Sequence, residues 1–400
     1  MTGAGTAGSA GVYLRPAGVP DERADAVRAI LTELWGGPVT VMPAGAASAA
    51  IAAALRAGGG LAFHSSGTTN ASTCAVFDAA TRRRHVAAVL ATVGLTDDLT
   101  WCAMPAPGYA YGLSIVETHA AAGIEVTFLP RQDQARQLAT FAATARWPLG
   151  LYLTPQALPV LLAAGLPAEA VRRVVVAGGR LSDAGARALT ARFPGVDLTN
   201  MYGQAELGPR IATWRGPAAE FVAGDVGQPL PGVGITITPR ADVGAGADVV
   251  PPVPPAPGAP GRILVTSQLA ATFLIKDPAA GPQPQPATVD TGDLGRYDER
   301  GHLIHCGRGD HILNVAGTKV DVEEMRRTLE EALQPIAVRI AHRPALVAGD
   351  VVPMVQVVAA AEAPLHARDV RRALHGTVGS IAALCDVRVV EALTVGESGK

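Results

Sequence analysis

The sequence predicts a layered α/β fold, with a large N-terminal α/β domain that contains a β-rich subdomain and a small mobile α+β C-terminal domain. Three observations predict it. Strand-like and helix-like runs alternate over the first half of the chain. After about Gly216 the helical signals fade, and Pro and Gly separate short β-like runs. From Asp310 onward a compact pattern of its own begins. We therefore expect domains at 1–309 and 310–400, with a shortened N-terminal part at 1–60 and the β-rich subdomain at 217–309.

The alternation in the first half begins with a predicted helix over 21–35. The Pro20-Asp21 pair is a typical start signal, and apolar residues follow it at helical spacing: Ala24, Val27, Ile30, Leu31 and Leu34. Strands are predicted at 61–64, 100–104, 125–128, 151–153 and 173–177. Helices are predicted at 46–56, 82–92, 132–145, 155–164 and 182–193. Because strands and helices alternate, we expect a mainly parallel sheet.

The second half is predicted to be richer in strands. Short β-like runs at 235–237 and 263–265 stand between Pro-rich loops at 251–260 and 277–286. The C-terminal pattern then predicts a charged amphipathic helix at 321–333 and a second helix at 367–378. Its strands are predicted at 337–340, 351–358 and 387–390.

The overall composition excludes several classes of protein. The hydrophobic fraction of 48% supplies a core, and the net charge of −2 gives no broad basic field, so we expect no nucleic-acid partner. The four cysteines lie far apart with no Cys-x-x-Cys pair, which disfavours a zinc site or a disulfide framework and favours the cytoplasm. The apolar stretch at 43–54 ends at Arg56, too early to span a membrane, and residues 1–10 have no signal-peptide pattern.

Five polar or glycine-rich segments carry the candidate chemistry. His64 to Asn70 follows a predicted strand, and its hydroxyls and glycine can donate hydrogen bonds to a phosphate chain. It is not a Walker loop, because no Gly-Lys-Ser/Thr follows. In 200–206 a tyrosine face can stack on a purine and a carboxylate can hold Mg²⁺. The others are 290–293, 307–320 and 396–400. Each segment taken alone is typical of an ordinary turn.

The order and spacing of these segments together resemble those of the acyl-adenylate-forming superfamily, which comprises acyl- and aryl-CoA ligases, peptide-synthetase adenylation domains and luciferases. The loop at 65–69 resembles its phosphate loop, 200–206 its Asn-x-Tyr-Gly-x-Thr-Glu motif, and 290–293 its Thr-Gly-Asp motif. Further matches are the adenine-flanking Gly-Gly segment at 174–182, the Gly-x-Pro-x-Pro-Gly turn at 224–232, the hairpin at 297–303, the hinge segment at 307–320 and the lysine loop at 398–400. The resemblance covers roughly 61–400, as in a compact member.

The resemblance implies a site for ATP, Mg²⁺ and a carboxylic acid. The β- and γ-phosphates would be held by Ser65, Ser66, Gly67, Thr68 and Thr69. Adenosine would be held by Gly179, Arg180, Asn200, Met201, Tyr202 and Gly203, with Asp293 on the ribose hydroxyls and Arg308 nearby. Glu206 would bind Mg²⁺, and Lys400 would bridge the acid and the α-phosphate, where negative charge builds in the transition state. Lys400, Thr68 and Glu206 are therefore the candidate catalytic residues.

The resemblance also implies a second half-reaction. The small domain would turn about a hinge at Asp310, and Gly317 and Lys319 would then line a channel for a thiol of CoA or of a carrier protein's phosphopantetheine. Two alternatives stay open. The acceptor could be an amine, which gives an amide, or the chain could be a non-catalytic homologue that binds a nucleotide or an acyl ligand.

The acid pocket is expected around 104–113. The resemblance implies that the acid contacts Tyr109, Ala110, Tyr111, Gly112 and Gly178. This segment holds no carboxylate to meet a buried ammonium, so a free α-amino acid is disfavoured and an aryl or short acyl acid fits better. The alternative for the two tyrosines is packing in the core with satisfied hydroxyls.

Several positions depart from the pattern. Asn70 to Thr73 stand where the phosphate loop usually continues with Gly-x-Pro-Lys, so the loop lysine is missing. Ala205 replaces the threonine before Glu206, and His311 stands where a second aspartate is common. A lost hydrogen bond to a charged group costs about 1.5–3 kcal/mol, which impairs a reaction without abolishing it. Lys400 is the last residue, and the bland alternative for it is a solvated tail.

Overall fold

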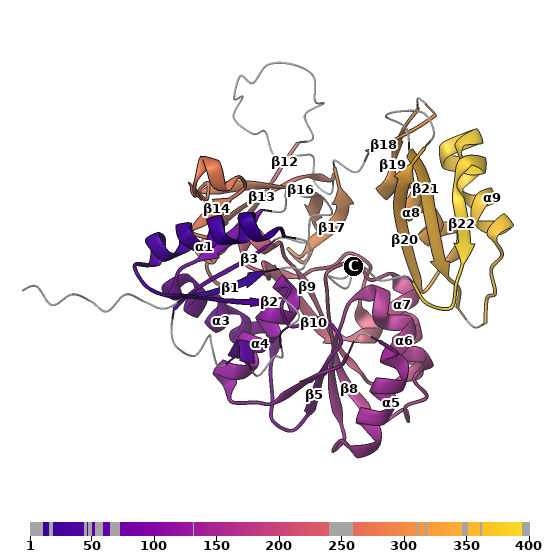
Figure 1. The fold of residues 1–400 in the computed structure, drawn as a ribbon. Coiled ribbons are helices and arrows are strands. Elements are labelled where there is room, and N and C mark those ends of the chain that lie inside the picture. The colour runs from indigo at the N-terminus through magenta and orange to yellow at the C-terminus, as the bar shows by residue number, and fades with distance from the viewer. Residues whose placement is uncertain are drawn as a thin grey trace, which may run out of the picture.

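Figure 1 shows the fold of the chain in a computed structural model. The structure describes residues 11–15, 19–43, 46, 50–52, 59–64, 73–130, 132–239, 259–309, 312–316, 318–345, 351–360 and 362–393. Short 3₁₀ turns occur at η1 (Pro155–Ala157), η2 (Ala205–Leu207), η3 (Ala218–Glu220), η4 (Pro278–Ala280) and η5 (Gly379–Leu384).

The central sheet is mainly parallel, as the alternation predicts. Its order across the described strands is β11-β10-β9-β8-β7-β5-β6, and β6, β5, β7, β8 and β9 all run parallel. The strands are β5 (Thr100–Ala103), β6 (Val126–Phe128), β7 (Leu149–Leu153), β8 (Val171–Ala177), β9 (Asp197–Tyr202), β10 (Ala212–Pro217) and β11 (Gln228–Pro229). The carboxyl ends of β8 and β9 therefore lie at one edge of the sheet, where ligands of open α/β sheets bind.

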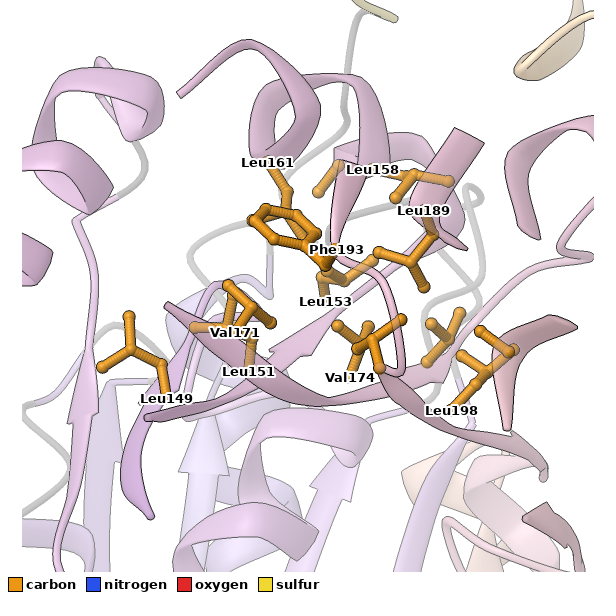
Figure 2. Close-up of a cluster of buried hydrophobic side chains, with 14 of the residues drawn as sticks. Leu149, Leu151, Leu153, Leu158, Leu161, Val171, Val174, Leu189, Phe193 and Leu198 are labelled. Atoms are coloured by element: carbon orange, nitrogen blue, oxygen red, sulfur yellow. The ribbon is translucent and has the colours of Figure 1, made fainter. Parts of the chain in front are cut away.

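Three helices cover one face of this sheet: α5 (Gln134–Thr144), α6 (Leu158–Ala163) and α7 (Asp183–Arg192). Figure 2 shows the cluster beneath them, in which Leu189 and Phe193 pack over Leu151, Leu153 and Val174. All five side chains are fully buried. The cluster fixes β8 and its C-terminal turn, because α7 begins directly after that turn.

A second sheet has the order β15-β14-β4-β3-β1-β2. Its strands are β1 (Gly11–Arg15), β2 (Val39–Pro43), β3 (Gly60–His64), β4 (Cys74–Phe77), β14 (Phe273–Ile275) and β15 (Gln283–Pro284), with α1 (Asp21–Trp35) packed on β1 and β2. Strands β14 and β15 come from the β-rich part of the chain, so this part also contributes two strands to the N-terminal sheet.

Helices α3 (Ala79–Val93) and α4 (Ala110–Ala122) lie between the two sheets. Leu113 and Val116 of α4 face the N-terminal sheet, while Ile115 faces the central one. The sequence did not predict α4, because Gly112 to His119 are buried all round and show no apolar stripe. A helix buried on every side gives no periodic signal.

The β-rich part forms an antiparallel sheet in the order β12-β13-β16-β17, with β12 (Val233–Thr238), β13 (Gly261–Ser267), β16 (Thr288–Tyr297) and β17 (Leu303–Arg308). The C-terminal part begins with the hairpin of β18 (Ile312–Val315) and β19 (Thr318–Asp321). It continues with α8 (Val322–Leu333), β20 (Ala337–Pro344), β21 (Val351–Val358), α9 (Ala367–Val378) and β22 (Asp386–Val389). Both helices pack on one core with Val355 and Val357, and the predicted elements of this part are confirmed.

No helix in the described ranges is both long and apolar enough to cross a membrane.

Candidate active site

A cavity of about 350 Å³ lies between the ends of β8 and β9 and the C-terminal part of the chain. The large-domain wall combines the turn after β8, the end of β9, and residues of the β-rich sheet. The opposite wall comes from α8 and β20. The lining residues used below are Gln156, Gly178, Gly179, Arg180, Asn200, Met201, Tyr202, Gly203, Gln204, Asp293, His305, Arg308 and Glu330.

The turn after β8 presents backbone to this cavity. Gly178 has a φ of 84°, a left-handed value that favours glycine. A Cβ atom on Gly179 would meet the Gln156 side chain at 3.0 Å, so this position leaves room only for a small residue. The pair therefore lets a ligand approach the main chain, which is what an adenine-flanking segment requires.

The end of β9 sends alternate side chains to opposite faces. Asn200 Nδ2 donates to the backbone oxygen of Asp225 at 2.8 Å, and the Tyr202 hydroxyl donates to Asp293 Oδ2 at 2.6 Å. Met201 instead joins the apolar cluster on the other face of the strand. Burial and the adjacent carboxylate raise the pKa of Tyr202 well above its ordinary value, so its hydroxyl keeps its proton.

Asp293 is the buried carboxylate of the cavity, with 4% of its surface exposed. Gln204 Nε2 donates to Oδ2 at 2.9 Å, and His305 Nε2 and Arg308 Nε each lie 3.8 Å from a carboxylate oxygen. Burial by itself raises the pKa of Asp293, but the His305 hydrogen bond and charge, the Tyr202 hydroxyl and Arg308 together hold it below its usual range. A negative acceptor is thus held at neutral pH at the base of the cavity.

Two hydrogen-bond acceptors in the same cavity have no donor among the described residues. Asn200 Oδ1 and Gln156 Oε1 are buried and have no hydrogen-bond partner in the described part of the chain. Buried acceptors are nearly always satisfied, so each needs a donor from a ligand or from water. An exocyclic amine of a purine is such a donor, and together with Asp293 for ribose hydroxyls these groups fit a nucleoside.

The segment after β9 carries Glu206 in η2, where its backbone oxygen accepts a hydrogen bond from Ala271 N at 3.0 Å. Its side chain does not line the cavity formed by the described residues. It lies two residues beyond Gln204, whose amide also donates to Thr291 O at 2.8 Å.

The predicted acid segment lies at the start of α4, outside this cavity. Tyr109 precedes the helix, and the Tyr111 hydroxyl donates to the backbone oxygen of Val175 at 3.0 Å. Gly112 packs so closely on Ala106 O that no Cβ fits. Of Tyr109, Ala110, Tyr111, Gly112 and Gly178, only Gly178 lines the cavity within the described residues.

Other predicted residues cannot be placed. The phosphate loop Ser65, Ser66, Gly67, Thr68 and Thr69 lies outside the described residues, as do Asp310, Gly317 and Lys400. Lys319 is described: it is exposed on β19 and is not a lining residue of the cavity.

The C-terminal part contacts the turn after β8 directly. Arg180 Nε donates to Glu330 Oε2 at 3.2 Å, while its Nη1 donates to His305 O at 2.8 Å. Ser182 Oγ, which caps α7, also lies 2.9 Å from Ile336 O. Arg187 Nη2 donates to Gln334 Oε1 at 2.6 Å. Arg180 thus links all three parts that surround the cavity.

Sequence reasoning missed Gln156, Gln204 and His305. Gln204 lies inside a motif that was recognised, but the motif leaves its position unspecified. His305 and Gln156 belong to segments with no chemical pattern of their own. Only the pairing of β16 with β17 and the η1 turn bring them to the cavity.

Comparison with known proteins agrees with this geometry. A family model described as AMP-binding enzyme matches residues 61–272, more than half of the chain. The chain belongs to the AMP-binding enzyme family. It is thereby a member of the acyl-adenylate-forming superfamily, as the motif order predicts. Its mixed α/β fold is also that of the superfamily's solved structures.

Curated relatives of this AMP-binding enzyme are peptide synthetases. It is 29% identical over 187 residues to the phosphinothricin tripeptide synthetase PhsB of Streptomyces viridochromogenes, covering 45% of the chain and 15% of that protein. It is 27% identical over 236 residues to a probable non-canonical nonribosomal peptide synthetase, CymA, of Salinispora arenicola, covering 55% of the chain and 3% of that protein. The chain thus spans a small share of both relatives.

Similar solved structures share the fold over most of the chain. The amide bond synthetase McbA of Marinactinospora thermotolerans has a TM-score of 0.63 and 19% identity, covering 99% of this chain and 88% of that one. An anthranilate CoA ligase, AuaEII, in complex with anthranoyl-AMP has a TM-score of 0.63 and 20% identity, covering 85% of this chain and 64% of that one. At these identities the likeness shows the fold alone.

Proposed function

We propose that the chain activates a carboxylic acid with ATP, forming an acyl-adenylate and releasing pyrophosphate, and then transfers the acyl group to the thiol of CoA or of a carrier protein. The observation that carries the proposal is the nucleoside-sized cavity in which Asp293, charged and buried, lies beside the unpaired acceptors Asn200 Oδ1 and Gln156 Oε1. An aryl or short acyl acid is the proposed substrate class.

In the first half-reaction the acid carboxylate attacks the α-phosphorus of ATP in line. A new C–O–P bond forms, and the bond to the β-phosphate oxygen breaks, so the pyrophosphate leaves with its electron pair. Asp293 accepts hydrogen bonds from the ribose hydroxyls, and the side-chain oxygens of Asn200 and Gln156 accept hydrogen bonds from the adenine amine. These contacts fix the α-phosphorus relative to the acid. No covalent bond to the protein is needed, because positioning and charge neutralisation supply the acceleration.

The remaining roles are assigned from the motif match. Ser65, Ser66, Gly67, Thr68 and Thr69 hold the β- and γ-phosphates, Lys400 bridges the acid and the α-phosphate, and Glu206 holds Mg²⁺. The metal supplies charge neutralisation of the phosphates when bound. Tyr202 and Gly179 enclose the adenine, with Met201 and Gly203 beside them, and Arg180 and Arg308 border the adenosine.

The second half-reaction requires the C-terminal part to turn about Asp310. We assign Gly317 and Lys319 to the channel for the pantetheine thiol. The hydrogen bonds of Arg180 and Arg187 to Glu330 and Gln334 then break, because they join the two parts that move. Amide formation with an amine shares the first half-reaction, and the acceptor is decided in the second. We place the reaction in the cytoplasm, where the free cysteines stay reduced.

The test is pyrophosphate release from ATP and Mg²⁺ over a panel of aryl, acyl and amino acids, beside a Lys400→Ala control. The proposal expects release with one acid class and its loss in the control. CoA, a carrier protein or an amine added to the adenylate then identifies the acceptor. Nucleotide binding without pyrophosphate release for any acid contradicts the proposed enzymatic activity and supports the non-catalytic alternative.

A further inference from the structure

Arg210 is a fully buried cation without a carboxylate partner. It lies between η2 and β10, and none of its side-chain surface is exposed. Its Nη1 lies 2.8 Å from Met201 Sδ, a weak acceptor. Among the described residues no carboxylate lies within ion-pair distance, and the Nε and Nη2 atoms are buried with no hydrogen-bond partner.

The groups around Arg210 carry no negative charge. Its guanidinium carbon lies 5.5 Å from the centre of the Tyr111 ring. Burial raises the pKa values of Tyr111 and Tyr152, so both phenols are neutral. Burial and the charge of Arg210 lower the pKa of His85 to about 3, so this ring is neutral as well.

The two unpaired atoms are adjacent on the guanidinium. Nε and Nη2 form its side edge, which presents two parallel N–H groups. This edge matches the two oxygens of a carboxylate and binds them as a bidentate pair. A buried cation is retained in proteins when an anion pairs with it, and this one has no such group among the described residues. A ligand is therefore the natural source of the anion.

The position of Arg210 decides which part of a ligand reaches it. Met201 and Tyr202 are neighbours on β9 and point to opposite faces of the strand. Tyr202 faces Asp293 in the nucleotide cavity, while Met201 contacts Arg210 on the other face. Tyr111, from the predicted acid segment, lies on the same side as Arg210. Because Met201 also lines the nucleotide cavity, Arg210 lies behind this residue of the cavity wall.

We propose that the activated acid is a dianion whose second carboxylate pairs with the Nε–Nη2 edge of Arg210. One carboxylate of a dicarboxylic acid meets the α-phosphate, and the other carries the negative charge that this buried site lacks. The inference rests on the proposed adenylation and narrows its substrate class. Aryl and acyl acids with a single carboxylate leave Arg210 unpaired and are poorer substrates.

The first experiment compares matched acids that differ in the second charge, such as pentanoate with glutarate and 4-methylbenzoate with terephthalate. Acid-dependent pyrophosphate release should show at least a tenfold higher kcat/KM for one diacid than for the matched acid with a single carboxylate. Arg210→Met should abolish this preference, whereas Arg215→Met on β10 should keep it. The inference is overturned if the acids with a single carboxylate have an equal or higher kcat/KM and this ratio is unchanged in Arg210→Met. The proposed adenylation is not affected by that result.

A second measurement does not depend on turnover. Calorimetric titration with glutarate and terephthalate in the absence of ATP should show binding to the wild type and none to Arg210→Met. Removal of an unpaired buried charge should also raise the Tm of the ligand-free variant, whereas a merely structural arginine predicts a lower Tm. Equal binding by both proteins, or no binding to the wild type, contradicts the proposal even if adenylation fails for other reasons.

Discussion

The Tyr202 hydroxyl lies 2.6 Å from Asp293 Oδ2, so a single hydrogen bond joins β9 of the central sheet to β16 of the β-rich sheet inside the cavity. Gln204 donates to the same oxygen at 2.9 Å. The shared acceptor fixes the carboxylate relative to β9 without any bound ligand. Such preorganisation lowers the ordering cost of binding.

Asp293→Asn is expected to weaken ATP binding by at least tenfold. The amide keeps the shape but loses the charge that accepts two ribose hydroxyls, and tenfold corresponds to about 1.4 kcal/mol. Calorimetric titration with ATP measures it. Asp290→Asn is the matched control, because this carboxylate pairs with Arg262 at the surface. Equal affinity in Asp293→Asn and the wild type would contradict the ribose assignment.

Ala205→Thr is expected to accelerate adenylation by about one to two decades, the rate equivalent of about 1.5–3 kcal/mol. The substitution restores the hydroxyl that the motif usually carries before Glu206, and position 205 is only partly buried. Single-turnover formation of the adenylate measures the chemical step. Ala205→Val controls for added bulk, and a threonine variant no faster than the valine variant would rule out an effect of the hydroxyl.

Glu330→Gln is expected to loosen the contact between the C-terminal part and the turn after β8. Arg180 then loses its ionic partner and keeps its bond to His305 O. A partly exposed pair of this kind contributes up to about 1 kcal/mol. Hydrogen exchange of the segment 178–187 should become faster, while Glu331→Gln, an exposed neighbour, should leave it unchanged. Identical exchange in both variants speaks against Arg180 as the link.

Stability is expected to fall as the pH drops from about 6.5 towards 4, in part because of His119. Burial lowers the pKa of this histidine from 6.5 to about 4 in the folded protein. The unfolded chain therefore binds a proton over this window while the folded one does not, which favours unfolding as the pH falls. His119→Gln should flatten the dependence of the free energy of unfolding on pH. The exposed His366→Gln should not, and an unchanged slope in His119→Gln would refute the assignment.

Much of the fold follows from periodic patterns. The helix at 21–35 and the elements from 322 onward match because each has one apolar face and clear ends. Helix α4 was missed because both of its sides are buried, and β1 and β2 because no motif or alternation marks them. Ordered spacing therefore predicts amphipathic elements better than buried ones.

The candidate site shows the same division. Asp293, Tyr202, Asn200 and Gly179 lie in motifs, and the structure brings them to one cavity. Their roles remain proposals. Arg210 was not singled out because a lone arginine after a motif carries no pattern; its importance comes from the missing counter-charge, which only packing reveals.

The most direct test of the account is the fate of the acid's oxygen. An accepted acid labelled with ¹⁸O in the reacting carboxylate is turned over with ATP and an acceptor, and the products are analysed by mass spectrometry. Attack of the carboxylate on the α-phosphorus predicts one ¹⁸O in AMP, because the acceptor breaks the acyl C–O bond and leaves that oxygen on phosphorus. Unlabelled AMP, or label in inorganic phosphate beside ADP, would contradict an acyl-adenylate.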